Sequence, residues 1–379
     1  MELIPCNNGY QEPEVLENHQ QCAKIEAQKE REWAALPSEL VEDVANLLLD
    51  NDVADLICFR LVCKPWKNTV KLDPSALDRR YHPRWWILLP RSNDRSTWCE
   101  FLNIVTRKTI KMDLELVGNH TVVAGSTAAP EGMLVLRDEA SLIIRILNPL
   151  TGHVIDLPSV KTLRRGRRRG PVSRKFREEH KVTAAGFSGD TNVVIYFGEV
   201  NRMVVAKPGD ARWTPVRGLR SPILTSITFQ RRFYCIDHQN LLVLDMSGVF
   251  PRLVVAIAMN TRLYSVNLLD NSGKNLMVQC RRMPWDSRVF RYQNVILVYK
   301  VDLEEGTVTR VHDLAGQAVF AGDLGAVVLP SATLWPCVES NAVYFKFGRS
   351  QVFGVHHMGR PYPDYRDVVG TCGIPQNHY

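Results

Sequence analysis

The sequence lacks the features that would place it in a membrane or among disulfide-bonded secreted proteins. No apolar run approaches the roughly 18 residues that a membrane-spanning helix requires, and the N-terminal residues show no signal-peptide pattern. The nine cysteines are widely spaced and include no Cys-x-x-Cys pair, which disfavours a disulfide framework and a zinc ribbon. We therefore expect free thiols and a location in the nucleus, the cytoplasm or both.

The sequence also lacks the short motifs that mark common enzymes. It contains no phosphate-binding loop, no Gly-x-Gly-x-x-Gly turn and no Gly-x-Ser-x-Gly turn. His356-His357 has no third metal ligand at a recognisable spacing, and alternation along a strand would point the two rings to opposite faces. Asp245, Asp302 and Asp323 lie near strand ends, where turn formation is the simpler interpretation. We predict no catalytic residue, no metal and no cofactor.

What the chain does have is the length and composition of a globular protein. It has 379 residues, of which 45% are hydrophobic and 23% are charged, as is usual for a protein with a packed core. The length suggests one large domain with a small one. The formal net charge of +7 is mild for this length and does not demand a nucleic-acid partner.

Much of the excess charge lies in one segment, residues 161–181. Five arginines fall there within six positions: Arg164, Arg165, Arg167, Arg168 and Arg169. The segment is interpreted either as a nuclear-targeting signal or as a solvated, self-repelling loop inserted in the β region. Only Phe176 is close to it, so an aromatic platform for bases is missing and nucleic-acid binding is the least favoured alternative.

The pattern of the chain changes twice. Residues 1–31 are polar and are interpreted as a flexible leader, residues 32–80 have helical spacing, and residues 81–379 are rich in short strands. In the helical part, Leu40, Val44, Leu47 and Leu48 form one apolar stripe.

Two further short helices are predicted after this stripe. The run Asp50-Asn51-Asp52 ends the first helix and offers an N-cap for the second. Pro65 fits the first turn of a third helix. Because the second helix is apolar on two faces, three such helices cannot bury all their apolar surface against each other. We expect a partner to cover the remainder.

The strand-rich part repeats a frame of strand, polar turn and strand. The repeated turns lie at Lys108, Gly152, Gly209, Gly248, Gly306 and Gly359. The steps between them are 44, 57, 39, 58 and 53 residues, close to the size of a propeller blade when insertions are allowed. We predict an α+β chain in which three helices precede a mostly antiparallel all-β domain, a β-propeller of about six blades. A two-sheet sandwich is the alternative, but it would need two domains and no linker is visible.

The segment from Leu36 to Val70 resembles an F-box. The matching elements are Leu36-Pro37, Glu39-Leu40, Asp55-Leu56 and Val62-Cys63-Lys64-Pro65-Trp66. The sequence departs from many members of that family at Asp50–Val53, where they carry a proline before the second helix. The resemblance implies that the residues contacting the Skp adaptor are Leu36, Pro37, Glu39, Leu40, Val62, Cys63 and Trp66.

The C-terminal half resembles a large plant family in which an F-box precedes a domain of unknown function, predicted as a kelch-like propeller. The resemblance is carried by 299–303 (YKVDL), 311–314 (VHDL), 316–323 (GQAVFAGD), 336–337 (PC) and 341–345 (NAVYF). It implies assembly with the Skp adaptor, and through it a cullin, into an SCF-type ubiquitin ligase. The chain would then be a non-catalytic subunit that binds an unidentified protein target.

Two alternatives stay open at this point. The first is a nuclear interaction or regulatory module that acts outside any ligase. The second is an enzyme built on a propeller, such as a sugar-processing hydrolase, which would need paired carboxylates at the central channel. Co-purification of the adaptor distinguishes the ligase subunit from the module that acts outside a ligase. A structure can show whether paired carboxylates meet at the central channel, as the enzyme would require.

Overall fold

The computed structural model of the protein describes residues 33–72, 78–89, 96–124, 130–164, 173–259, 265–282, 285–286, 291–292, 295–322, 325–329, 338–346, 352–360 and 364–367. The predicted leader, residues 1–31, lies outside these ranges. The chain divides into two compact units, Met1–Asp73 and Pro74–Tyr379. Within the described ranges, no helix combines the length and the apolar character needed to cross a membrane.

The first unit contains three helices among its described residues: α2 (Ser38–Asn51), α3 (Val53–Leu61) and α4 (Lys64–Thr69). Asp52 separates α2 from α3, and its carboxylate accepts a hydrogen bond of 3.0 Å from the Ala54 N–H. This carboxylate satisfies one of the unpaired donors at the start of α3. Pro65 lies in the first turn of α4, where its missing N–H costs nothing. The predicted helix breaks are therefore confirmed.

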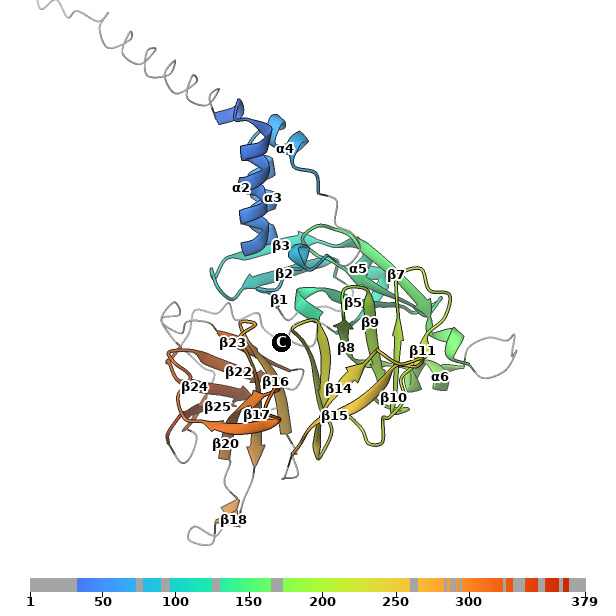
Figure 1. Ribbon diagram of the computed structural model, residues 1–379, viewed down its shortest axis with the longest axis vertical. Coiled ribbons are helices and arrows are strands. Elements are labelled where there is room, and N and C mark those ends of the chain that lie inside the picture. The colour runs from blue at the N-terminus through green and yellow to red at the C-terminus, as the bar shows by residue number, and fades with distance from the viewer. Residues whose placement is uncertain are drawn as a thin grey trace, which may run out of the picture. The chain divides into compact units, whose positions relative to one another are not determined.

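Among its described residues, the second unit contains six sheets of three to five strands, which we number as blades one to six (Figure 1). Blade one contains β1 (Trp86–Leu88), β2 (Trp98–Asn103) and β3 (Thr109–Asp113). Blade two contains β4 (His120–Ala124), β5 (Leu134–Asp138), β6 (Ile143–Leu147) and β7 (Val154–Ser159). Blade three contains β8 (Val182–Ser188), β9 (Asn192–Phe197), β10 (Arg202–Ala206) and β11 (Thr214–Pro215).

The remaining blades complete the unit. Blade four contains β12 (Thr225–Phe229), β13 (Arg232–Ile236), β14 (Asn240–Asp245) and β15 (Arg252–Ala258). Blade five contains β16 (Ser265–Asn271), β17 (Asn275–Arg282), β20 (Val295–Asp302) and β21 (Thr307–Val311). Blade six contains β22 (Ala318–Gly322), β23 (Gly325–Leu329), β24 (Ala342–Lys346), β25 (Val352–His357) and β26 (Asp364–Asp367). A separate hairpin joins β18 (Trp285–Asp286) to β19 (Arg291–Tyr292).

The sheets are arranged as a propeller. The inner strands of successive blades, β4, β8, β12, β16 and β23, contact one another in that order. Pairing within the blades is antiparallel except between β22 and β24, which run parallel. All six predicted turns fall between the last two strands of a blade. The prediction of a mostly antiparallel propeller with about six blades is confirmed.

The core lies between neighbouring blades. Strand β9 shows why: Val193, Ile195 and Phe197 pack between blades two and three, whereas Val194 and Tyr196 pack between blades three and four. Successive side chains of a strand point to opposite faces, so a central strand covered on both faces needs a continuous apolar run. Further layers of the same kind separate blades four and five and blades five and six.

The turns between the last two strands of a blade share one hydrogen-bond pattern. In blade two, Asn148 Oδ1 accepts from the N–H groups of Leu150 at 3.1 Å and Thr151 at 3.2 Å. Asn103, Asp245 and Asp302 cap the corresponding turns of blades one, four and five. A side chain that imitates a backbone turn in this way is the physical reason for Asn and Asp there. Asp245 and Asp302 are turn formers as predicted, and Asp323 lies outside the described residues.

The segment Asp78–Trp85, which we call the anchor segment, belongs to the propeller unit. It contains the 3₁₀ turn η1 (Arg79–Tyr81). The Asn148 side chain donates to the carbonyl oxygen of Tyr81 at 2.8 Å. Gly132, at the end of the 3₁₀ turn η3 (Pro130–Gly132), has φ +81°, and a Cβ there would collide with the backbone carbonyl of Pro83. Only glycine allows this approach.

We predict that Gly132→Ala destabilises the propeller by more than about 2 kcal/mol, because it adds a backbone collision to the cost of a positive φ. Gly152→Ala is the matched control: its φ is +72° and no atom lies within 4 Å of the added Cβ. The control should cost only about 1–2 kcal/mol. Urea unfolding of the full chain, followed by tryptophan fluorescence, measures both. Equal losses in the two variants would contradict the close packing of the anchor segment.

An exposed apolar surface and two polar clusters

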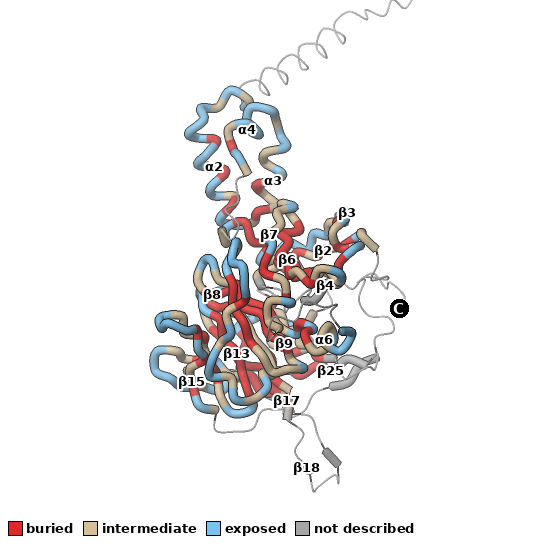
Figure 2. The backbone as a smooth tube through the Cα atoms, turned by 90° about the vertical axis from the view of Figure 1, so that its right-hand side faces the viewer, coloured by how far each residue is buried: buried red, intermediate tan, exposed pale blue. Residues whose placement is uncertain are grey.

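Helix α2 carries two apolar stripes, and only one of them is buried. The buried stripe consists of Val41, Ala45 and Leu49. The other follows the predicted spacing from Leu40, which is 50% exposed, through Val44 to Leu47, which is 71% exposed. Figure 2 shows exposed positions along most of α2, whereas the blades are buried inside. The stripe read from the sequence is therefore not the core face of this helix.

The end of α3 adds further exposed apolar side chains. Leu61 is 71% exposed and Val62 is 65% exposed. We call Leu40, Val44, Leu47, Leu61 and Val62 the helical apolar surface. Isolated exposed hydrophobic residues are ordinary, but the described part of this small unit has six, since Trp33 is also exposed, and such a number is typical of a surface that a partner covers. The unit's own core is small and consists mainly of Val41, Ala45, Leu49, Val53, Leu56 and Val70.

The seven residues predicted to contact an adaptor differ in exposure. Pro37, Glu39, Leu40 and Val62 are exposed, whereas Leu36, Cys63 and Trp66 are partly buried. Leu40 and Val62 therefore belong to the helical apolar surface, and we keep them as candidate contacts. Leu47 and Leu61 are more exposed than Leu40. The F-box motif includes neither of them. Helical spacing alone places Leu47 in the stripe.

Trp66 has partners within the helical unit itself. Its ring stacks on Phe59 with centroids 4.4 Å apart and an angle of 20° between the planes. Its indole N–H donates to the carbonyl oxygen of Trp33 at 3.2 Å. A stacked pair adds stability beyond the area that it buries. Trp66 therefore holds α3 and α4 together, whether or not it also contacts a partner.

The basic segment is only partly described. The 3₁₀ turn η4 (Val160–Leu163) lies at its start and helix α6 (Arg174–Glu179) lies near its end. Arg164 is partly buried, and Arg165, Arg167, Arg168 and Arg169 lie outside the described residues. Arg177 Nη1 on α6 donates to the Glu139 carbonyl at 2.8 Å, and Arg137 Nη1 donates to the carbonyls of Arg177 and His180, both at 3.2 Å. These bonds fix α6 to the end of β5.

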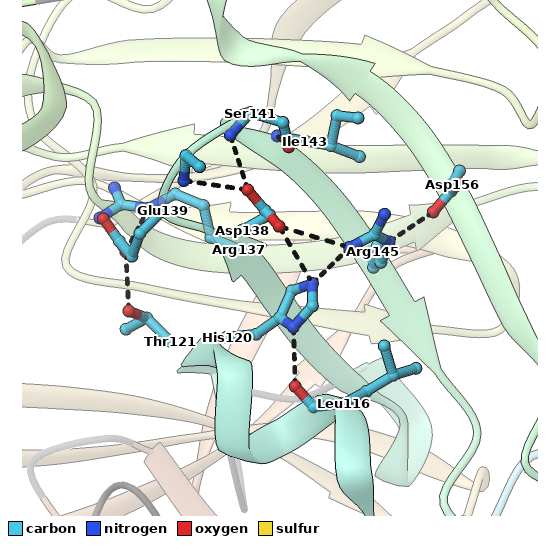
Figure 3. Close-up of polar contacts among 11 residues, drawn as sticks. Leu116, His120, Thr121, Arg137, Asp138, Glu139, Ser141, Ile143, Arg145 and Asp156 are labelled. Atoms are coloured by element: carbon cyan, nitrogen blue, oxygen red, sulfur yellow. Dashed lines mark hydrogen bonds and ion pairs between the residues drawn. The ribbon is translucent and has the colours of Figure 1, made fainter.

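A polar cluster lies at the start of blade two, after helix α5 (Glu115–Asn119) (Figure 3). His120 Nδ1 donates to the Leu116 carbonyl at 2.7 Å, and His120 Nε2 accepts from Arg145. Arg145 Nε also donates to Asp156 at 2.7 Å. Asp138 accepts from the N–H groups of Ser141 at 2.6 Å and Ala140 at 2.9 Å.

This cluster joins strands and offers no free base for catalysis. Both ring nitrogens of His120 are occupied, so the ring cannot accept a proton from a substrate without breaking a bond. The Ser141 N–H holds the pKa of Asp138 below its ordinary value, so this carboxylate is ionised and serves as a turn cap. The cluster ties β4 to β5, β6 and β7, which is a structural role.

The remaining titratable groups do not assemble a metal site. No three His, Cys, Asp or Glu side chains come together to hold an ion within the described part of the chain. On β25, His356 is buried, while the ring of His357 lies 3.2 Å from Glu339. Burial raises the pKa of the Cys235 thiol, which makes this thiol a poor nucleophile and a poor ligand.

A second polar cluster holds the anchor segment and was not predicted. Glu131 accepts hydrogen bonds from Arg79 on both carboxylate oxygens and from His82 Nδ1 at 2.7 Å. Burial, followed by the guanidiniums of Arg79 and Arg84, lowers the pKa of His82 to about 3. The Glu131 carboxylate opposes this shift, but burial and the two guanidiniums outweigh it. His82 is therefore neutral at neutral pH.

The six radially arranged sheets define a β-propeller protein with a helical N-terminal unit. The KIB1-4 beta-propeller family model matches residues 101–361, more than half of the chain. The protein therefore belongs to the KIB1-4 beta-propeller family. No significant match occurs among curated proteins.

Solved structures resemble the chain only at the level of the propeller. Virginiamycin B lyase from Staphylococcus aureus is 8% identical, with 75% of this chain and 84% of that chain covered and a TM-score of 0.38. The Cps50 (Swd1) β-propeller domain from Myceliophteria thermophila is 9% identical, with 75% and 89% covered and a TM-score of 0.37. Likeness at this level carries no argument about activity.

We predict that Trp66→Ala destabilises the helical unit by about 3 kcal/mol, because it removes the stack on Phe59 and the bond to Trp33. Leu47→Ala should change the stability of the same unit by less than about 0.5 kcal/mol, because Leu47 is exposed. Hydrogen exchange of the amides in α2 and α3 measures the two variants separately from the propeller. A large loss of protection in Leu47→Ala would contradict the exposed position of this stripe.

The neutral His82 gives the propeller a pH dependence. The unfolded chain binds a proton at His82 below the ordinary pKa of 6.5, whereas the folded chain binds one only near pH 3. The free energy of unfolding should therefore fall as the pH decreases within this range, by at most about 1.4 kcal/mol per pH unit from this group. Urea unfolding between pH 7 and about pH 4.5 should show a smaller slope in His82→Asn than in the natural chain. Identical slopes in the two proteins would contradict a neutral His82 in the folded chain.

Proposed function

We propose that the protein is the target-recognition subunit of an SCF-type cullin-RING ubiquitin ligase. In this proposal the helical unit binds the Skp adaptor, and the propeller binds a protein target. The single observation that carries it is the helical apolar surface, which an ordered three-helix unit leaves uncovered. The F-box resemblance of residues 36–66 gives that surface a specific partner. The protein itself performs no chemical step in this role.

The proposed mechanism is proximity. A target held on the propeller would be kept near the ubiquitin-loaded enzyme, because adaptor and cullin connect the two. Tethering raises the effective concentration of the target's lysines at that enzyme without any new chemistry in this chain. Polar clusters in the described part of the propeller are engaged in structural bonds, as at His120 and Glu131, which fits a binding role.

We expect the double variant Leu40→Ala/Val62→Ala to lose at least about tenfold in affinity for the purified Skp adaptor. Apolar side chains at the centre of an interface are worth about 2 kcal/mol each, and about 1.4 kcal/mol corresponds to a factor of ten. Both residues are exposed, so the variant should fold normally. Surface plasmon resonance with the adaptor alone, and then with the adaptor–cullin complex, measures the effect.

The matched control is Val249→Ala/Val255→Ala, which truncates two exposed apolar side chains of the propeller. It should bind the adaptor with unchanged affinity. If the natural chain shows no adaptor binding, the ligase proposal fails, and an interaction module outside any ligase takes its place. Equal losses in both double variants would mean that the binding is non-specific adhesion.

We also propose that the basic segment directs the chain to the nucleus. The support is its sequence alone, five arginines within six positions, which matches the composition of targeting signals. Residues 161–181 fused to a fluorescent reporter should accumulate in the nucleus, and the same fusion with Arg167, Arg168 and Arg169 replaced by alanine should not. Equal distributions would identify the segment as a solvated loop.

A further inference from the structure

The outer edge of blade four carries most of the exposed apolar side chains of the described propeller. Val249 is 93% exposed, Val255 is 57% exposed, and Phe250 is also exposed. Val249 and Phe250 form the tip between β14 and β15, and Val255 lies on β15 itself. The fourth large exposed hydrophobic residue of the described propeller, Trp98, stands by itself on blade one.

This tip is held in place. Asp245 accepts from the Ser247 N–H at 2.9 Å and from the Ser247 hydroxyl at 2.6 Å. The guanidinium of Arg252 donates to the same carboxylate at 3.0 Å. The guanidinium of Arg217 lies over the Phe250 ring, 3.8 Å from its centroid. These contacts order the loop before binding. Binding of a partner would therefore not cost the conformational entropy of ordering this loop.

Arginines lie in blade four and in the segment that leads into it. Residues 211–258 contain six arginines, two aspartates and no lysine or glutamate. Both aspartates are engaged: Asp237 accepts from Ser221, Gln239 and Asn240, and Asp245 caps the tip. Arg212, Arg217 and Arg220 are exposed. An acidic partner would be attracted to this edge.

Strand β15 also has an open edge. It is the last strand of its sheet. On its outer side, only Arg217 pairs with the start of the strand. The Arg217 N–H donates to the Pro251 carbonyl and the Leu253 N–H donates to the Arg217 carbonyl, both at 2.8 Å. Within the described residues no other strand pairs along this edge. Pairing with β14 is regular from Arg252 to Val255 and shifts register between Val255 and Ile257, where β15 has a bulge. Backbone N–H groups two residues apart in the regular part point to the same side, so Val255 N–H faces outward like that of Leu253.

The outer strands of blades one to three are less suited to pairing. β11 has two residues, β7 contains Asp156 and Pro158, and β3 contains Lys111 and Asp113. Short strands, charges and prolines are the usual means of preventing edge-to-edge pairing. β15 has seven residues, begins with Arg252 and has a bulge after Val255, but it is longer than these strands and presents the exposed Val255. Its open edge therefore fits an incoming strand.

We infer that the outer edge of blade four binds an extended protein segment in which acidic and apolar residues alternate, by adding it as a strand to β15. Backbone groups of β15 would pair with the segment, Val249, Phe250 and Val255 would contact its apolar side chains, and Arg217 would face its carboxylates. Val249 and Val255 favour protein over nucleic acid, because valine offers bases no stacking surface, and Arg217 already covers one face of the Phe250 ring. This inference concerns the propeller alone and holds whether or not the helical unit binds an adaptor.

The test uses the full chain and a displayed library of peptides of about ten residues, in which Asp or Glu alternates with Val, Ile or Leu. Binding of a selected peptide, labelled with fluorescein, is measured by fluorescence anisotropy.

Arg217→Glu and Phe250→Ala should each weaken peptide binding by about tenfold or more. Val255→Pro, which removes an outward N–H, should do the same. Arg310→Glu, an exposed position on the outer strand of blade five, and Trp98→Ala are the matched controls and should change the affinity less than about twofold.

Three results would overturn the inference. The first is a library that yields no peptide sensitive to Arg217 and Phe250. The second is equal weakening in Arg310→Glu, which would show that net charge alone attracts the peptide. The third is full competition by an oligoglutamate or a single-stranded DNA of the same length, which would show binding of any polyanion.

Discussion

The propeller depends on one constraint: a strand that is apolar on both faces must be covered on both faces. Val193–Phe197 illustrates it, since alternate side chains of this strand enter two different core layers. A single sheet with such strands cannot exist alone in water, because one face would stay exposed. Each blade is therefore stabilised by its neighbours, and the radial arrangement of the sheets follows from the sequence of their central strands.

The helical unit meets the same constraint differently. Its second apolar stripe, Leu40, Val44 and Leu47, remains in solvent, although the three helices are well formed around Val41, Ala45 and Leu49. A unit of this size buries a small fraction of its surface and has little stability to spare. The uncovered stripe is thus a physical reason to expect that the unit functions in a complex, and the F-box resemblance names which complex to test.

Much of the fold could be predicted because its determinants are local. The apolar runs at 193–197, 241–244 and 295–299 all lie in strands, and the Asn and Asp residues that close the turns lie next to them in sequence.

The core face of α2 could not be predicted, because the helix has two apolar stripes and only packing decides which of them is buried. The cluster of Arg79, His82 and Glu131 left no signal either, since 49 residues separate His82 from Glu131. The blade-four edge was likewise hidden: the turn at Gly248 was predicted, but the exposure of Val249 and Val255 depends on the finished sheet.

The cluster around Glu131 also determines where the two units can be cut apart. A fragment that begins at residue 81, where composition changes, would remove Arg79 and leave the largely buried carboxylate of Glu131 without its cation, beside a neutral imidazole. A buried charge that loses its partner costs several kcal/mol, so such a fragment would fold poorly or aggregate. Any recombinant version of the propeller therefore has to retain the anchor segment, which lies upstream of the first strand and supplies Arg79 and His82.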